Sequence, residues 1–119
     1  MTVSELINKT EKTAFSFEVL PPVKGTGTSA LFSTIDALKE FGPEDINITT
    51  HRSEYVYVEQ PDGTYLRHFM RRRPGTVAVA SAIMQKYGIK VVPHVVVSGM
   101  TKEDIEYMLL DLQFLGIQD

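Results

Sequence analysis

Apolar residues are arranged along the chain in blocks of two kinds, which alternate. Three short blocks, such as "AFSFEVL", are apolar without helical spacing and predict strands over residues 14–20, 45–49 and 90–97. Three longer blocks carry apolar residues three and four positions apart and predict helices over residues 29–41, 76–87 and 102–115. The pattern therefore predicts a strand followed by a helix, three times over.

Residues that start or stop secondary structure lie at the ends of these blocks. Pro21 and Pro22 lack amide donors and end the first strand, and Gly42-Pro43 ends the first helix. Gly88 supplies a left-handed stop after the second helix. The segment "TKED" at residues 101–104 matches a capping box, with Asp in place of Glu or Gln.

Alternating strands and helices are the pattern of a parallel sheet with right-handed crossovers. The third strand is apolar at nearly every position, which predicts that it is buried on both faces. The last four residues, "GIQD", look like the start of a fourth strand. A barrel of eight such units typically needs about 250 residues. We therefore expect an α/β fold in which residues 1–119 form a single incomplete domain, the N-terminal part of a (βα)8 TIM barrel.

One segment does not fit this alternation. Residues 53–69 alternate aromatic and apolar positions, turn at Pro61-Asp62-Gly63 and then resume, which predicts a hairpin. We interpret it as an insertion after the second strand, at the end of the sheet where strand–helix barrels build their active sites. It is either a lid over that site or a surface excursion over neighbouring loops.

Composition narrows the classes of function. The chain has 119 residues, of which 43% are hydrophobic, and this is enough for a core. It has no Cys, so a disulfide framework and a thiolate metal site are excluded. A net charge of −3 argues against nucleic acid as a partner, and no apolar run approaches membrane-spanning length. We expect a cytoplasmic protein with no membrane partner.

Glu18 is the first candidate for chemistry, because it lies between Phe17 and Val19 in an apolar strand. Its side chain can point into the mouth of a barrel, where burial disfavours the charged form. A carboxyl group that keeps its proton at neutral pH can act as a general acid. The alternative is a half-buried Glu18 paired with a neighbouring Lys or Arg.

Further candidates follow the second and third strands. Thr49, Thr50, His51 and Arg52 suit the carbonyls, amides or phosphates of a ligand, or else cap an ordinary loop. His94, after Pro93 and among valines, either donates to a ligand or is satisfied by a backbone carbonyl. No neighbouring carboxylate completes a ligand set for a metal, so we expect none.

Three motifs in this order, "SFEVLPP", "INITTHR" and "VVPHVVV", resemble the methylenetetrahydrofolate reductase family. The resemblance implies an eight-stranded barrel that binds FAD at the carboxyl ends of its strands. It also implies that NAD(P)H reduces the flavin, which then reduces 5,10-methylenetetrahydrofolate to 5-methyltetrahydrofolate. Glu18 matches the general acid of the family, Thr49 and Thr50 match positions beside the flavin, and His94 matches a histidine that contacts the cofactor.

The sequence also departs from the family pattern. Many members have a tyrosine and small residues after the second strand, where this chain has Thr50, His51 and Arg52. The family's R-G-D segment on strand four would begin just beyond Asp119. We therefore expect a homo-oligomer that associates through the open sheet, and little binding of FAD by residues 1–119 alone. The alternative function is a non-catalytic fragment or interaction module that self-associates.

Overall fold

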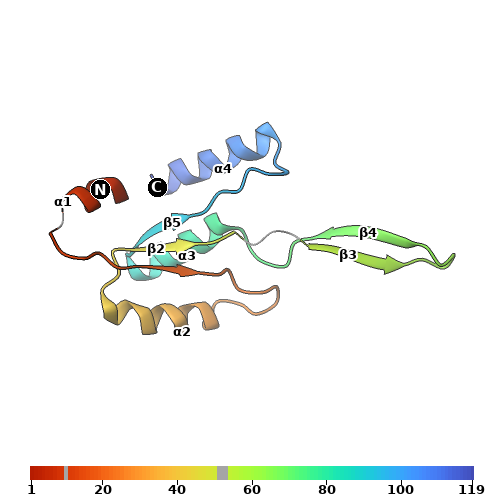
Figure 1. The fold of residues 1–119 in the computed structure, drawn as a ribbon, viewed down its shortest axis with the longest axis horizontal. Coiled ribbons are helices and arrows are strands. Elements are labelled where there is room, and N and C mark those ends of the chain that lie inside the picture. Colours follow the sequence, from red (N-terminus) through yellow and green to blue (C-terminus); the bar gives the residue numbers. More distant parts are fainter. Residues whose placement is uncertain (10, 51–53) are drawn as a thin grey trace.

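The computed structural model describes residues 1–9, 11–50 and 54–119. Its strands and helices follow one another along the ribbon of Figure 1. In chain order they are α1 (Val3–Lys9), β1 (Ser16–Val19), α2 (Ser29–Leu38), the short 3-10 helix η1 (Lys39–Phe41), β2 (Asp45–Ile48), β3 (Glu54–Glu59), β4 (Tyr65–Met70), α3 (Thr76–Tyr87), β5 (Lys90–Pro93) and α4 (Lys102–Leu115).

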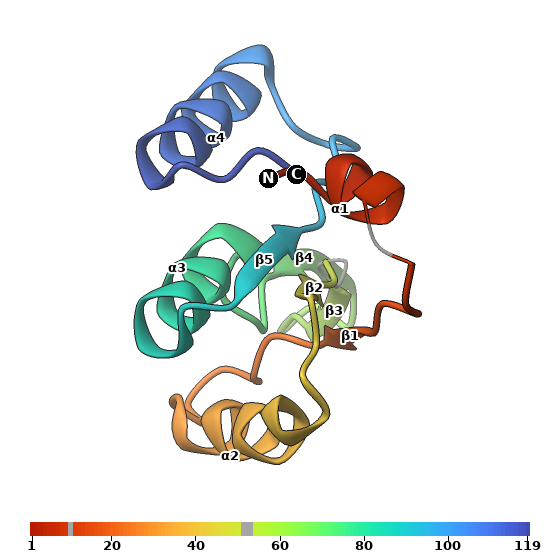
Figure 2. The ribbon, with the colours of Figure 1, turned by 90° about the vertical axis from the view of Figure 1, so that its left-hand side faces the viewer.

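A parallel sheet with the strand order β1-β2-β5 forms the centre of the molecule. Phe17 on β1 lies level with Ile46 on β2, and Ile46 lies level with Val91 on β5. Helices α2 and α3 lie on one side of this sheet and α1 lies on the other (Figure 2). The predicted mixed α/β fold with a parallel sheet is confirmed, and it is compatible with part of a TIM barrel.

The hydrophobic core lies between one face of the sheet and helices α2 and α3. Side chains alternate between the two faces of a strand, so every second residue points toward the helices. These residues include Ile46, Ile48 and Val91, which are all buried. The helices contribute apolar side chains from positions with helical spacing, namely Leu31, Ile35, Val79, Ala80 and Ile83.

The third strand of the sheet is shorter than the sequence predicted. β5 ends at Pro93, and Val97, expected inside the strand, is 56% exposed. The expectation that this strand is buried on both faces is therefore wrong. Beyond Pro93, the amide of His94 still donates to the carbonyl of Ile48, and the carbonyl of His94 accepts hydrogen bonds from the side-chain hydroxyls of Thr50 and Thr76.

The predicted hairpin is present as a separate two-stranded antiparallel sheet, β3-β4. The amide of Gln60 donates to the carbonyl of Thr64, and Gly63 adopts a φ of 83° at the turn. The hairpin projects away from the parallel sheet (Figure 1), and the molecule measures 65 × 33 × 23 Å along its principal axes. Whether it is an insertion into the barrel plan stays a prediction.

The predicted helices are all present, but α4 packs less closely than its apolar face suggested. The capping box at its start is formed, because Thr101 Oγ1 accepts from the Asp104 amide and Asp104 Oδ2 accepts from the Thr101 amide. No residue of α4 is buried, and Phe114 is 90% exposed. Helix α1 was not predicted, and residues 117–119, expected to begin a strand, form no regular element.

Candidate functional site

The face of the sheet opposite the core is polar. Alternation places Glu18, Asp45, Asn47 and Lys90 on this face, because their neighbours along each strand point into the core. Glu18 lies level with Asn47 on the adjacent strand. In a strand–helix barrel this is the face that lines the interior, so polar residues here are candidates for binding a ligand.

Glu18 belongs to this face, but its side chain is exposed. The sequence-based expectation of an apolar enclosure is wrong for the part of the chain that the structure describes. Helices α2 and α3 cover the other face of the sheet, so no apolar side chain of the core surrounds the Glu18 carboxylate. Its role as a general acid stays a prediction.

The structure brings together three of the predicted site residues at the carboxyl ends of the strands. The Thr49 amide donates to the carbonyl of Val19, at 3.1 Å, which continues the pairing of β1 with β2. Thr50 Oγ1 donates to the carbonyl of His94, at 2.8 Å. Thr49, Thr50 and His94 are all half-buried. The predicted His51 and Arg52 lie outside the described residues.

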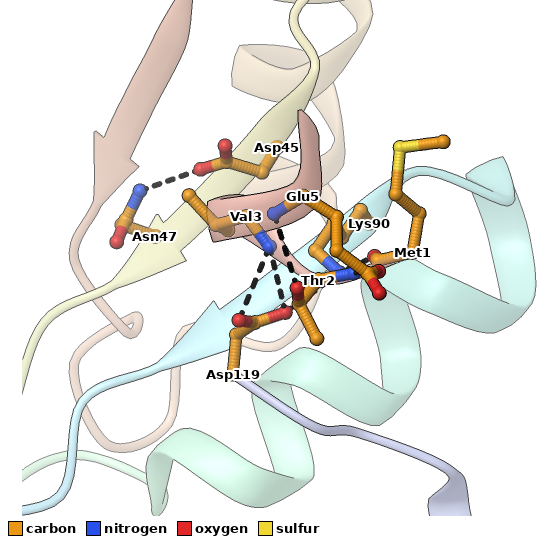
Figure 3. Close-up of polar contacts among 8 residues, drawn as sticks. All are labelled: Met1, Thr2, Val3, Glu5, Asp45, Asn47, Lys90 and Asp119. Carbon is orange, nitrogen blue, oxygen red and sulfur yellow. Dashed lines mark hydrogen bonds and ion pairs between the residues drawn. The ribbon is translucent and has the colours of Figure 1, made fainter. Parts of the chain in front are cut away.

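Sequence reasoning missed a polar chain that runs across this face. Asn47 Nδ2 lies 2.8 Å from Asp45 Oδ1 (Figure 3), and Asn47 Oδ1 lies 3.2 Å from His94 Nε2. The alternation of Asp, Asn and Thr with two Ile in "DINIT" was the signal, because it places Asp45, Asn47 and Thr49 on one face. The partner on β5 could not be read from this pattern.

Asp45 is the most enclosed charged group of this face. It is only 6% exposed, and burial raises its pKa, while the hydrogen bond from Asn47 and the charge of Lys90 act in the opposite direction. Asp119 and Glu44 add repulsion that also raises this pKa. Asp45 lies at the amino end of β2, far along the strand from Thr49 and Thr50.

An open cleft of about 720 Å³ lies between α3 and α4, beyond the carboxyl ends of the strands. Its lining includes Thr50, Thr76 and His94, together with two arginines and two aspartates, namely Arg71, Arg73, Asp104 and Asp111. A volume of this size lies within the usual range for small-molecule and cofactor sites. Neither Glu18 nor Thr49 lines it, so the cleft and the polar face meet only near His94.

Residues 1–9, 11–50 and 54–119 contain no cluster of three or more His, Asp or Glu side chains placed to hold a metal ion. They also contain no helix with the length and apolar character that crossing a membrane requires.

Comparison with known proteins relates this chain to a protein family. The family model described as methylenetetrahydrofolate reductase matches residues 2–119, which is nearly the whole chain. No curated protein matches the sequence.

Proposed function

We propose a specific reaction for this chain, because it belongs to the methylenetetrahydrofolate reductase family and is thus an oxidoreductase of that folate-related type. It supplies the amino-terminal strand–helix units of a flavin-dependent enzyme that reduces 5,10-methylenetetrahydrofolate to 5-methyltetrahydrofolate with NAD(P)H. The observation that carries this proposal is the match over residues 2–119. The polar face supports it, because Glu18 and Asn47 lie there on adjacent strands and His94, directly after β5, contacts Asn47.

The residues at the carboxyl ends of the strands fit a cofactor such as FAD. Thr49, Thr50 and His94 are half-buried there, and Thr50 and His94 line a cleft of suitable size. We propose that these three residues hold the flavin together with His51 and Arg52. When bound, the flavin supplies hydride transfer, which no amino-acid side chain can provide.

Glu18 is the proton donor in this proposal. Opening the five-membered ring of the folate requires a proton on the departing nitrogen, and a protonated carboxyl group on the barrel face can supply it. The Glu18 side chain is exposed in the described part of the chain, so this role needs an enclosure around its carboxyl group. Bound flavin and folate, together with further strands of a barrel, would exclude water from this face.

The test separates the two half-reactions in the flavin-loaded enzyme. Glu18→Gln keeps the size and polarity of the side chain but cannot donate the proton of a carboxyl group. We expect bleaching of the flavin by NAD(P)H at the wild-type rate and reoxidation by methylenetetrahydrofolate slowed at least 100-fold. Glu11→Gln, at an exposed position before β1, is the matched control. Normal reoxidation in Glu18→Gln would refute the assignment.

A second candidate function is self-association without catalysis, and two observations favour it. Within the described chain the order β1-β2-β5 leaves both outer strands of the parallel sheet unpaired. The hairpin also exposes large apolar side chains, among them Tyr57, Tyr65 and Leu66. Light scattering over a range of concentrations tests this candidate, and a monomer at the highest concentration would exclude it.

A further inference from the structure

The main chain of His94, which lies just after β5, makes three hydrogen bonds. Its amide donates to the carbonyl of Ile48, at 2.9 Å. Its carbonyl accepts from Thr50 Oγ1 at 2.8 Å and from Thr76 Oγ1 at 3.0 Å. These hydrogen bonds join the end of β2, the end of β5 and the start of α3 at one residue. The backbone of His94 is therefore fixed, and only its ring can turn.

The ring of His94 meets Asn47, and the orientation of that amide follows from its other neighbour. Asn47 lies 2.8 Å from Asp45 Oδ1, and an ionised carboxylate can only accept hydrogen bonds. The amide nitrogen of Asn47 must therefore face Asp45, which leaves the amide oxygen facing His94 Nε2 at 3.2 Å. Burial raises the pKa of Asp45, whereas the hydrogen bond from Asn47 and the charge of Lys90 favour its ionised form.

An amide oxygen accepts and cannot donate, so the hydrogen atom of this contact must be on Nε2 of His94. We propose that Asn47, oriented by Asp45, is a positioning residue that fixes His94 as the Nε2–H tautomer. The other ring nitrogen, Nδ1, has no partner among the residues that the structure describes. In the neutral ring it is then a hydrogen-bond acceptor.

What this tautomer means for ligand recognition at His94 rests on the proposed function. A fixed ring that presents Nδ1 as an acceptor recognises an N–H or O–H group of the bound molecule, in contrast to a freely rotating ring, which can donate or accept. His94 also lines the cleft beyond the strands. Asn47 therefore acts on the ligand through His94 and not by direct contact.

Long-range ¹H–¹⁵N correlation spectra of the histidine rings test the tautomer without any ligand. The chain has only three histidines, His51, His68 and His94, and a His94→Gln sample assigns the ring signals of His94. Spectra are recorded at a pH at which the rings are neutral. We expect a wild-type pattern of a protonated Nε2 and an unprotonated Nδ1. A mixture of tautomers, or a protonated Nδ1, would overturn the proposal.

Two substitutions identify the cause of the preference. Asn47→Leu removes the acceptor, and Asp45→Asn keeps the shape but lets the Asn47 amide adopt either orientation, because an amide can both donate and accept. We expect both variants to show mixed tautomers, with unchanged dispersion of the amide signals. Asn8→Leu, at the other asparagine and on the exposed surface of α1, should keep the wild-type pattern. A wild-type pattern in both Asn47→Leu and Asp45→Asn would refute the role of Asn47.

Flavin titration of the enzyme separates this proposal from the proposed function. If both hold, Asn47→Leu should weaken flavin binding about tenfold, the effect of one lost hydrogen bond to a ligand, and Asn8→Leu should bind as the wild type does. A fixed tautomer in the wild type with no flavin binding would leave Asn47 as a positioning residue and would refute the assigned cofactor.

Discussion

Lys90 Nζ lies 2.7 Å from Asp119 Oδ2, and this ion pair joins the first residue of β5 to the last residue of the chain. The same carboxylate accepts from the amide of Val3, at 3.2 Å, at the start of α1 (Figure 3). The Lys90 ammonium group also donates to the carbonyl of Met1. These contacts hold both ends of the chain at the amino ends of the strands, away from Thr49 and His94.

The Asp119 carboxylate should stabilise the fold in a pH-dependent way. The hydrogen bond from Lys90 lowers the pKa of Asp119, and the Val3 amide acts in the same direction. A lowered pKa in the folded state means that the stabilisation is present above the unfolded value, roughly 3.9, and is lost as the pH falls through the folded value. We expect Asp119→Asn to lower the free energy of unfolding by about 1 kcal/mol at pH 7.

Urea denaturation at a series of pH values measures this difference. The loss in Asp119→Asn should disappear in acid, where the wild-type carboxylate is protonated. Glu106→Gln, an exposed carboxylate on α4, is the control and should unfold as the wild type does at every pH. An equal loss at pH 7 and in acid would show that the charge of Asp119 is not the cause.

Asp45 should show the opposite pH dependence. Burial raises the pKa of Asp45, so the folded state binds the proton more tightly than the unfolded chain. The free energy of unfolding then falls as the pH rises from the unfolded value, roughly 3.9, through the folded one. Asp45→Asn carries no charge, so relative to the wild type it should gain stability over this interval.

The measurement is again urea denaturation across the acid range, with Asp111→Asn on the exposed surface of α4 as the control. A difference between Asp45→Asn and the wild type that does not change with pH would contradict the assignment. Such a result would mean that Lys90 and Asn47 fully compensate for the burial of the carboxylate.

Gly88 should resist substitution because of its backbone conformation. It ends α3 with a φ of 63°, and its amide donates to the carbonyl of Met84, at 2.9 Å. A Cβ atom there would meet open space, so the cost of a side chain comes from the left-handed conformation alone. We expect Gly88→Ala to lose about 1 kcal/mol in urea denaturation and Gly88→Asn to lose less, because Asn tolerates this conformation. Equal losses would contradict this reasoning.

The hairpin should be dispensable for folding. β3 and β4 pair with each other and not with the parallel sheet, so a short Gly-Ser linker in place of residues 54–70 should leave the thermal midpoint unchanged. If the hairpin is a lid, the flavin-loaded enzyme with the linker should lose turnover. If it mediates association, the linker variant should lose self-association in light scattering.

A double variant, Tyr57→Ser with Tyr65→Ser, distinguishes these effects from a change in chain length. It removes two exposed rings from one face of the hairpin and keeps both strands. The same loss as in the linker variant would assign the effect to the aromatic face. A fall in the thermal midpoint of the linker variant would show that the hairpin supports the core.

The sequence by itself determined the local elements, because their signals are local. Helical spacing and capping residues placed α2, α3 and α4, and Pro61 to Gly63 marked the turn of the hairpin. The order of strands and helices then specified a parallel sheet. The motifs around Glu18 and His94 pointed to the family that the comparison shows.

Only the tertiary structure decided which strand residues meet and which are covered. Asn47 and His94 are 47 positions apart in the chain, and the register of β2 against β5 alone brings them to 3.2 Å. The exposure of Glu18 was likewise undetermined, because burial of a strand residue depends on what packs against its face. Periodicity shows that a strand has two faces, whereas the partners of each face come from distant segments of the chain.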